Sequence, residues 1–341
     1  MLTERQRLVL SAIVDDYIRS AEPVGSRSIS KRGEVGFSAA TIRNEMSDLE
    51  ELGFLEQPHT SAGRIPSHKG YRYYVDHLVQ LRGLDSREKS MLKVFFAEKM
   101  EETEQVVQQA AMILSSLTNY TSIVLGPEMF NTTLKHLQIV PLNEKTAVAI
   151  IVTNTGHVEN KTVTIPDNLP IEELEKFVNL LNAKLKGVSL LHFRAKLYNE
   201  ISSEMSKYVS QYEELLHMLE NVVEPGDEDR IFVSGSTNIL TQPEFRDVDK
   251  VKGLLDLFAQ PMTLMKLFHS VPEGIQVRIG AENENEAISQ CSLITATYSV
   301  GGQSLGTIGI VGPTRMEYGK VISLLDLISR DVSSVIGRLY K

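Results

Sequence analysis

The sequence predicts a multidomain α+β protein that begins with a winged helix-turn-helix. Three observations predict this class. Residues 1–83 contain helical patterns followed by two short strand patterns around a polar turn. Residues 134–165 and 275–312 are typical of strands, and helical patterns flank both regions. The length of 341 residues suits two or three domains, because single cores rarely grow beyond about 250–300 residues.

The first two helices are predicted from capping and turn signals. Thr3 and Gln6 form a capping-box pattern that opens a helix, whose inner stripe is Val9, Ala12, Ile13 and Tyr17. The segment 22–25 (Glu-Pro-Val-Gly) breaks the chain, and residues 26–32 predict a short second helix. These lengths fit a module whose second and third helices cross the DNA backbone and enter the major groove.

The third helix has clear ends and one apolar side. Ser38 is a suitable N-cap, and Gly53 stands where a left-handed residue ends a helix. The inner stripe is Ile42, Met46 and Leu49, at helical spacing. The opposite face holds Ala40, Asn44, Ser47 and Glu51, with Arg43 on its shoulder.

Arg43 and Asn44 have side chains whose fork geometry reads guanine and adenine edges. Ala40 would let the helix approach a groove floor closely. The alternative for this helix is an ordinary amphipathic surface helix, on which Arg and Asn are common.

A wing and a fourth helix follow. Residues 54–57 and 65–66 predict the wing strands, and residues 59–64 predict the hairpin tip. Arg64, beside the flexible Gly63, suits a minor-groove or phosphate contact. Ser67 starts the fourth helix, and Lys69 and Arg72 near its start suit phosphate contacts.

The N-terminal region is electrically neutral overall, whereas the rest of the chain is acidic. Residues 1–83 contain 11 Lys/Arg and 11 Asp/Glu, so the net charge of −9 (35 against 44) comes from residues 84–341. Between His59 and Arg82, four basic residues stand against the single acid Asp76. This patch would attract phosphate, so we expect steep salt dependence from few contacts and little non-specific affinity. The expected DNA-contacting residues are Ser38, Ala40, Thr41, Arg43, Asn44, Ser47, Thr60, Ser61, Arg64, Lys69 and Arg72.

The remainder of the chain alternates between strand and helix patterns. Helices are predicted at 86–117, 170–185 and 316–339, and strands at 134–140, 146–153, 157–165, 275–280, 292–300 and 305–312. Between them, residues 190–274 are mostly helical and acidic, with a short strand at 231–234. Their apolar stripes suit either an inserted helical interface domain or an internal core, which the sequence cannot separate.

Patterns for catalysis, metals and cofactors are weak. Gly306, Gly309 and Gly312 lie in a strand-like run and lack the strand–glycine–helix order of a dinucleotide site, so close strand–helix packing is the better interpretation. The eight histidines have no ligand spacing, and Cys291 is the only cysteine, expected to be an inert strand residue. We therefore expect no metal and no cofactor.

Two motif groups resemble one known family, the bacterial heat-inducible transcription repressors called HrcA. The first runs from Gly36 to Met46 and continues through the wing segment 59–66 (HTSAGRIP). The second comprises residues 278–283 (RIGAEN) and 306–316 (GTIGIVGPTRM). The resemblance therefore spans nearly the whole chain.

The resemblance implies both a domain plan and a function. The plan is a winged-helix domain at 1–83, a GAF-like α+β domain at 86–188 and 275–341, and an inserted, mostly helical dimerisation domain at 189–274. The function is repression of chaperone operons through an inverted-repeat operator, bound by a homodimer. The GroEL chaperonin is expected to keep the repressor in its DNA-binding form.

Three function classes were compared. A ligand-sensing regulator would need a pocket with converging polar groups, which the sequence does not reveal. An enzyme would need a nucleophile–base set, paired carboxylates or a metal cluster, and we could place none. A partner-controlled repressor is favoured. The chain has no apolar run near the ~18 residues of a membrane span and no targeting pattern, so we expect a cytoplasmic protein.

Overall fold

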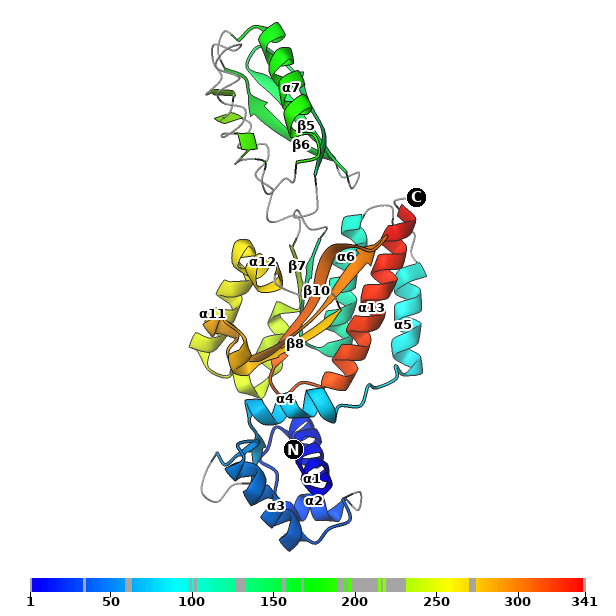
Figure 1. The fold of residues 1–341 in the computed structure, drawn as a ribbon, viewed down its shortest axis with the longest axis vertical. Helices are drawn as coiled ribbons and strands as arrows, with labels where there is room; N and C mark the ends of the chain where they lie inside the picture. Colours follow the sequence, from blue (N-terminus) through cyan, green and yellow to red (C-terminus); the bar gives the residue numbers. More distant parts are fainter. Residues whose placement is uncertain are drawn as a thin grey trace. The chain divides into compact units, whose positions relative to one another are not determined.

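The computed structural model contains two compact units. The first consists of Met1–Leu125, Ile231–Tyr298 and Thr307–Val335, and the second of Gly126–Arg230, Ser299–Gly306 and Ile336–Lys341. The residues that the structure describes are 2–32, 35–58, 63–97, 100, 103–126, 133–154, 158–166, 169–188, 193, 196–197, 214–215, 217–218, 231–269 and 274–339. Figure 1 shows the course of the chain through both units.

The first unit opens with the expected winged helix. Helices α1 (Glu4–Ser20), α2 (Ser26–Lys31) and α3 (Ala39–Glu51) precede the antiparallel strands β1 (Leu55–Glu56) and β2 (Ile65–Pro66). Helix α4 (His68–His77) follows at once. Thr3 caps α1 through the predicted reciprocal bonds with Gln6. The predicted order of three helices, a wing and a fourth helix is therefore confirmed.

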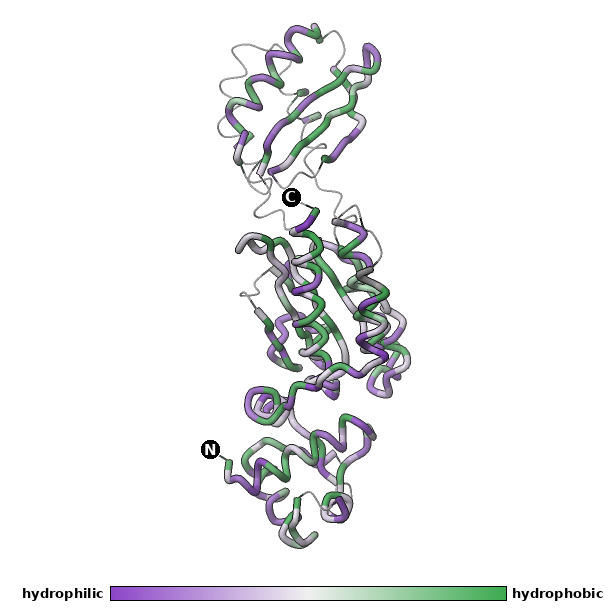
Figure 2. Tube along the Cα trace, turned by 90° about the vertical axis from the view of Figure 1, so that its right-hand side faces the viewer, coloured by the Kyte–Doolittle hydropathy of each residue, from purple (hydrophilic) through white to green (hydrophobic). Residues whose placement is uncertain are grey.

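A five-stranded sheet forms the centre of the first unit. Its strand order is β7-β3-β10-β9-β8, formed by β3 (Thr121–Leu125), β7 (Ile231–Ser234), β8 (Ile275–Ile279), β9 (Cys291–Val300) and β10 (Gln303–Pro313). Strand β3 pairs antiparallel with both β10 and β7, and β8 pairs antiparallel with β9. Figure 2 shows that these strands are largely hydrophobic, as expected for a sheet covered on both faces.

Helices from distant parts of the chain cover the sheet. The helices of this unit beyond the winged helix are α5 (Ser86–Ala97), α6 (Thr103–Thr118), α11 (Val248–Phe258), α12 (Pro261–His269) and α13 (Tyr318–Leu339), with short 3₁₀ turns η3 (Ser236–Thr241), η4 (Pro243–Phe245), η5 (Gly280–Glu282) and η6 (Glu286–Ile288). One apolar core joins β3, β9 and β10 to α11 and α12, including Ile123, Leu254 and Phe268. A side chain at Gly309 would overlap the Phe268 ring, so the predicted close strand–helix packing is confirmed there.

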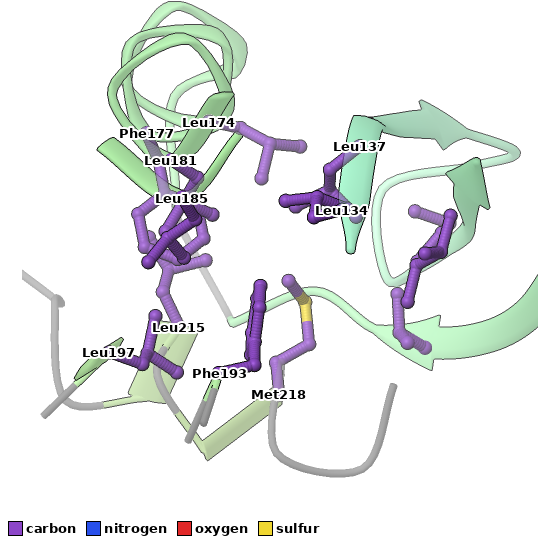
Figure 3. Packing of buried hydrophobic residues seen from close by; sticks show 14 of the residues in the cluster. Leu134, Leu137, Leu174, Phe177, Leu181, Leu185, Phe193, Leu197, Leu215 and Met218 are labelled. Atoms are coloured by element: carbon purple, nitrogen blue, oxygen red, sulfur yellow. The ribbon is translucent and has the colours of Figure 1, made fainter. Parts of the chain in front are cut away.

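The second unit is a three-stranded antiparallel sheet with a helix on one face. Strands β4 (Leu134–Pro141), β5 (Thr146–Thr153) and β6 (Val158–Thr164) pair in the order β4-β5-β6, and α7 (Ile171–Leu185) packs against them. Figure 3 shows Leu174, Phe177 and Leu181 of α7 meeting Leu134 and Leu137 of β4. Alternate β5 residues are fully buried in this core, so the strand buries one face as its period of two predicts.

The compact units differ from the expected domain boundaries. Strands β4–β6 were expected in the same domain as residues 275–341, but they form their own sheet in the second unit. Residues 231–269 were expected in the inserted domain, yet β7 pairs with β3, and α11 and α12 pack on the main sheet. Predicted helical residues between 198 and 213 lie outside the described part. The expected helix at 86–117 consists of two helices, α5 and α6.

Candidate nucleic-acid interface

Helix α3 is held by its cap and its buried stripe. Ser38 is the N-cap, and its Oγ accepts a hydrogen bond from the Thr41 N–H at 3.2 Å. Ile42, Met46 and Leu49 are buried, as the pattern predicted. The helix ends where Gly53 adopts φ +78°, a left-handed conformation that suits glycine. The remaining face is therefore free to meet a ligand.

The exposed face of α3 contains four of the predicted contact residues. Ala40, Arg43, Asn44 and Ser47 are exposed, and Thr41 is half-buried near the helix start. Among the described residues, the side chains of Arg43 and Asn44 make no hydrogen bond or ion pair. Two fork-shaped polar groups thus stand in solvent on a rigid helix. This is the arrangement that reads base edges in a major groove.

Basic residues outside the predicted set also lie on α1 and α2, among them Arg5, Arg27 and Lys31. Arg27 and Lys31 of α2 are exposed, on the helix that crosses the backbone in this type of module. Arg5 of α1 pairs with Glu45 of α3 at 3.3 Å, and its guanidinium lies 5.1 Å from the Phe37 ring centre. These cations were not among the predicted contacts, although their position in the first two predicted helices was a signal that could have identified them.

The base of the wing is attached to the turn after α1. Val24 and Arg64 exchange both backbone hydrogen bonds at 2.9 Å, and a side chain at Gly63 would collide with the Val24 backbone. The Arg64 guanidinium donates to Glu50 of α3 at 2.8 Å. Arg64 therefore joins the wing to α3, and a phosphate would have to compete with Glu50. The predicted contacts Thr60 and Ser61, at the wing tip, lie outside the described residues.

Lys69 also has a structural partner. Its Nζ donates to the Leu52 carbonyl at the end of α3, at 2.8 Å, and lies 4.5 Å from the centre of the Phe54 ring. A cation at the C-terminal end of a helix satisfies a free carbonyl and opposes the negative end of the helix dipole. Lys69 thus stabilises the end of α3, and its exposed side chain lies close to that helix.

Arg72 lies at the contact between α4 and the five-stranded sheet. Its Nε donates to the Glu282 carboxylate at 2.8 Å, a second bond to the same carboxylate comes from Nη2, and Nη2 also donates to the Val277 carbonyl at 2.5 Å. The hydrogen bonds to Glu282 raise the pKa of Arg72, so its charge is permanent. The structure therefore does not bring Arg72 together with the exposed residues of α3.

Features suited to other chemistry are few in the described residues. No cluster of three metal-ligating side chains occurs there, and no helix among them is long and apolar enough to cross a bilayer. Cys291 is buried in β9, where burial raises the pKa of its thiol to about 12. A cavity of about 400 Å³ beneath the wing is lined by both Lys69 and Glu56, so its charge favours no single ligand class.

Two family models match the chain. "Winged helix-turn-helix transcription repressor, HrcA DNA-binding" covers residues 1–80, and "HrcA protein C terminal domain" covers residues 104–322. The first match coincides with the winged helix described above. The second spans the sheets of both units.

Similar proteins extend over the full length. A protein of Brevibacillus brevis named "Heat-inducible transcription repressor HrcA" is 57% identical over 98% of both chains. One of the same name from Halalkalibacterium halodurans is 53% identical over 100% of this chain and 99% of its own. A crystal structure described as a hypothetical protein matches with a TM-score of 0.61 and 24% identity, covering 99% of this chain and all of that one. That structural match shows a shared fold.

Proposed function

The chain belongs to the HrcA family of heat-inducible transcription repressors, and we propose that it represses chaperone operons by binding an inverted-repeat operator upstream of them as a homodimer. The family consists of transcription repressors, not enzymes. A repressor of bacterial operons acts where the chromosome is, so the proposed location is the cytoplasm.

The exposed face of α3 carries this proposal. Arg43 and Asn44 are exposed and have no partner among the described residues, while the cap and the buried stripe fix the helix beneath them. In the proposed complex, α3 enters the major groove, Arg43 binds a guanine edge and Asn44 an adenine edge. The other proposed contacts from α3 and its N-cap are Ser38, Ala40, Thr41 and Ser47. From the wing, Thr60 and Ser61 contact the neighbouring DNA backbone or minor groove.

Phosphate contacts in this proposal come mainly from exposed cations near α3. Arg27 and Lys31 of α2 are exposed, and Lys69 lies at the end of α3. Arg64 contributes only if its guanidinium leaves Glu50. Each phosphate contact adds about 0.9 to the salt slope, so these few cations should give a modest salt dependence in place of the steep one expected from the sequence. The net charge of −9 on the whole chain should keep non-specific affinity low.

A dimer would place its two winged-helix domains on the two halves of an inverted repeat. We propose that the second unit supplies the dimer contact, since the central strand of its sheet presents apolar residues on the outer face. On β5, Val148, Ile150 and Val152 point away from the core that contains Ala147, Ala149 and Ile151. Among their cross-strand neighbours, Val140 and Val158 are 37% and 53% exposed, and the other four are His136, Gln138, Asn160 and Thr162. A matching face on a second copy would remove this surface from water.

The GroEL chaperonin is the proposed regulator, as the family resemblance implies. A partner that binds only the competent form raises its population by mass action. Unfolded proteins that occupy the chaperonin would then release repression. The five-stranded sheet with its covering helices is the proposed GAF-like part, for which we propose no small-molecule ligand.

The test is fluorescence anisotropy with a labelled inverted-repeat operator and a scrambled duplex, over a salt series, with and without chaperonin. Salt-sensitive binding that prefers the operator and strengthens with chaperonin is the expected result. Equal, weak binding to both duplexes in all conditions would contradict operator recognition. An Ile150→Asp variant, measured by sedimentation, tests the dimer separately: it should shift the protein to monomers.

A further inference from the structure

Two turns of the five-stranded domain contact the winged helix. They are residues 278–283, which form one motif of the family resemblance, and residues 312–316, which end another. The first turn meets α4 through Glu282 and Ala281, and the second meets α1 through Arg315. The winged helix is therefore attached to the sheet domain at two separate places within the first unit.

The first attachment is a forked ion pair. Arg72 uses Nε and Nη2 on the two oxygens of Glu282 and also binds the Val277 carbonyl, while Nη1 reaches Asp76 of its own helix at 3.1 Å. Such a bidentate arrangement fixes direction as well as distance, because both groups are planar. Next to it, the Ala281 N–H donates to Nδ1 of His68 at 3.3 Å.

The turn that presents Glu282 is itself rigid. Gly280 has φ +55°, and a side chain there would overlap the imidazole of His68. The buried Asn283 amide donates to the carbonyls of Gly280, Ile288 and Cys291 at 2.9–3.1 Å. Glu282 also accepts from the Ile279 N–H at 2.8 Å. Arg72 is therefore held by a preformed acceptor and not by a mobile surface carboxylate.

The second attachment uses Arg315. Its Nη1 donates to the Ile18 carbonyl of α1 at 2.8 Å, and its Nε donates to Glu244 at 2.5 Å. The Arg315 side chain is only 12% exposed. Between the two attachments, the buried Tyr71 of α4 packs against the buried Tyr318 of α13, with ring centres 5.9 Å apart.

We propose that Arg72 is a positioning residue: its clamp on Glu282, together with Arg315 on Ile18, fixes the winged helix on the sheet domain and so narrows the spacing of operator half-sites that a dimer accepts. This inference rests on the proposed function. It assigns Arg72 a role in operator geometry in place of the phosphate contact that the sequence predicted.

The consequence follows from the physics of divalent binding. Once one winged helix of a dimer is bound, the second binds its half-site at an effective concentration. That concentration depends on how closely the distance between the two winged helices matches the distance between the half-sites. Loosening the clamp leaves the contacts of each winged helix with its half-site unchanged. A looser clamp lowers the effective concentration of the second winged helix at the preferred half-site spacing. It also reduces the loss of affinity for operators with other half-site spacings.

The experiment compares the full-length protein with Arg72→Ala, Glu282→Gln and the double variant. Arg330→Ala is the matched control, since it removes an exposed α13 cation whose partner among the described residues is Asp326. Each protein is titrated against one half-site, the full operator, operators lengthened or shortened by two base pairs, and a scrambled duplex. Hydrogen exchange of the Ala281 amide, whose bond to His68 belongs to the clamp, is followed without DNA.

The clamp predicts the same defect in both single variants. Affinity for the full operator should fall about tenfold, the spacing preference should flatten, and half-site affinity and its salt slope should stay unchanged. The double variant should be no worse than either single one, because both break the same pair. Ala281 should exchange faster in all three, and Arg330→Ala should behave as wild type.

Other outcomes separate the possible failures. If Arg72→Ala weakens half-site binding and lowers the salt slope by about one while Glu282→Gln binds normally, Arg72 is a phosphate contact and the clamp is refuted. If wild type does not distinguish operator from scrambled duplex, the proposed function fails. In that case, the clamp would be overturned as well if the Ala281 amide exchanged hydrogen at the wild-type rate in the Arg72 and Glu282 variants. Faster exchange in these variants would support the attachment of the winged helix to the sheet domain, without its proposed effect on operator spacing.

Discussion

Arg43→Ala should weaken operator binding without changing the stability of the fold. The side chain is exposed on α3 and has no partner among the described residues, while the Ser38 cap and the buried stripe remain intact. Alanine is also the best helix former. We therefore expect the free energy of unfolding to change by less than about 0.5 kcal/mol, as for other surface substitutions.

The loss in binding can be estimated from the contact that the side chain would make. A bidentate contact between arginine and guanine contributes about 1–3 kcal/mol of discrimination, which corresponds to about 5- to 160-fold in affinity for one half-site. A homodimer places this residue on both half-sites, so the full operator should lose about 2–6 kcal/mol.

The assay is anisotropy with the wild-type operator and a panel of operators changed one base pair at a time. Arg43→Ala should lose affinity for the wild-type operator and should no longer distinguish the substitution at one guanine of each half-site. Arg330→Ala, which removes an exposed cation from α13, is the control and should keep both properties. Normal cognate binding by Arg43→Ala, or an equal loss on every duplex, would refute the placement of this residue against a base.

Three further predictions concern the remainder of the first unit. Gly280→Ala should lower the free energy of unfolding by about 1–3 kcal/mol in calorimetry, because φ +55° and the adjacent His68 ring exclude a side chain; a change within error would show that the turn can relax. Cys291 should resist thiol reagents at pH 7–8 until the protein unfolds, because burial raises its pKa to about 12; rapid labelling of native protein would contradict this. Burial raises the pKa of Glu282, but bonds from Arg72 and the Ile279 N–H outweigh it and lower the pKa below the ordinary 4.5. The stability from this lowered pKa is therefore present above pH 4.5 and lost as pH falls through the lower folded value. Unfolding titrations of wild type and Glu282→Gln should converge on acidification, and a constant difference down to pH 2 would refute the linkage.

Local patterns in the sequence predicted most of the elements correctly. The Thr3 and Ser38 caps, the stripe of α3 and the strands β4–β10 depend on spacing within a few residues, so they can be read without knowing the fold. The exposed face of α3 was predicted in the same way. The four predicted contact residues exposed on it follow from the helical period once the buried stripe is known.

Pairing between distant segments was not predictable from such patterns. A strand pattern does not name its partner, so β7 was expected in an inserted domain although it pairs with β3 of the main sheet. The prediction that basic residues contact phosphate had the same limit, because it depends on partners that are distant in the sequence. Arg64, Lys69 and Arg72 form a basic run in the sequence, but the structure places them against Glu50, the Leu52 carbonyl and Glu282.

The family, the winged helix and the exposed face of α3 could thus be predicted from local patterns, because caps, glycines and helical periods act over one or two turns. The folded structure was needed to show which cations already have partners and how the winged helix is attached to the sheet domain. Arg72 and Glu282 are 210 residues apart, and no local pattern reports that a cation already has a carboxylate partner. Ion pairs and strand pairing depend on distances in space, which the folded chain alone supplies.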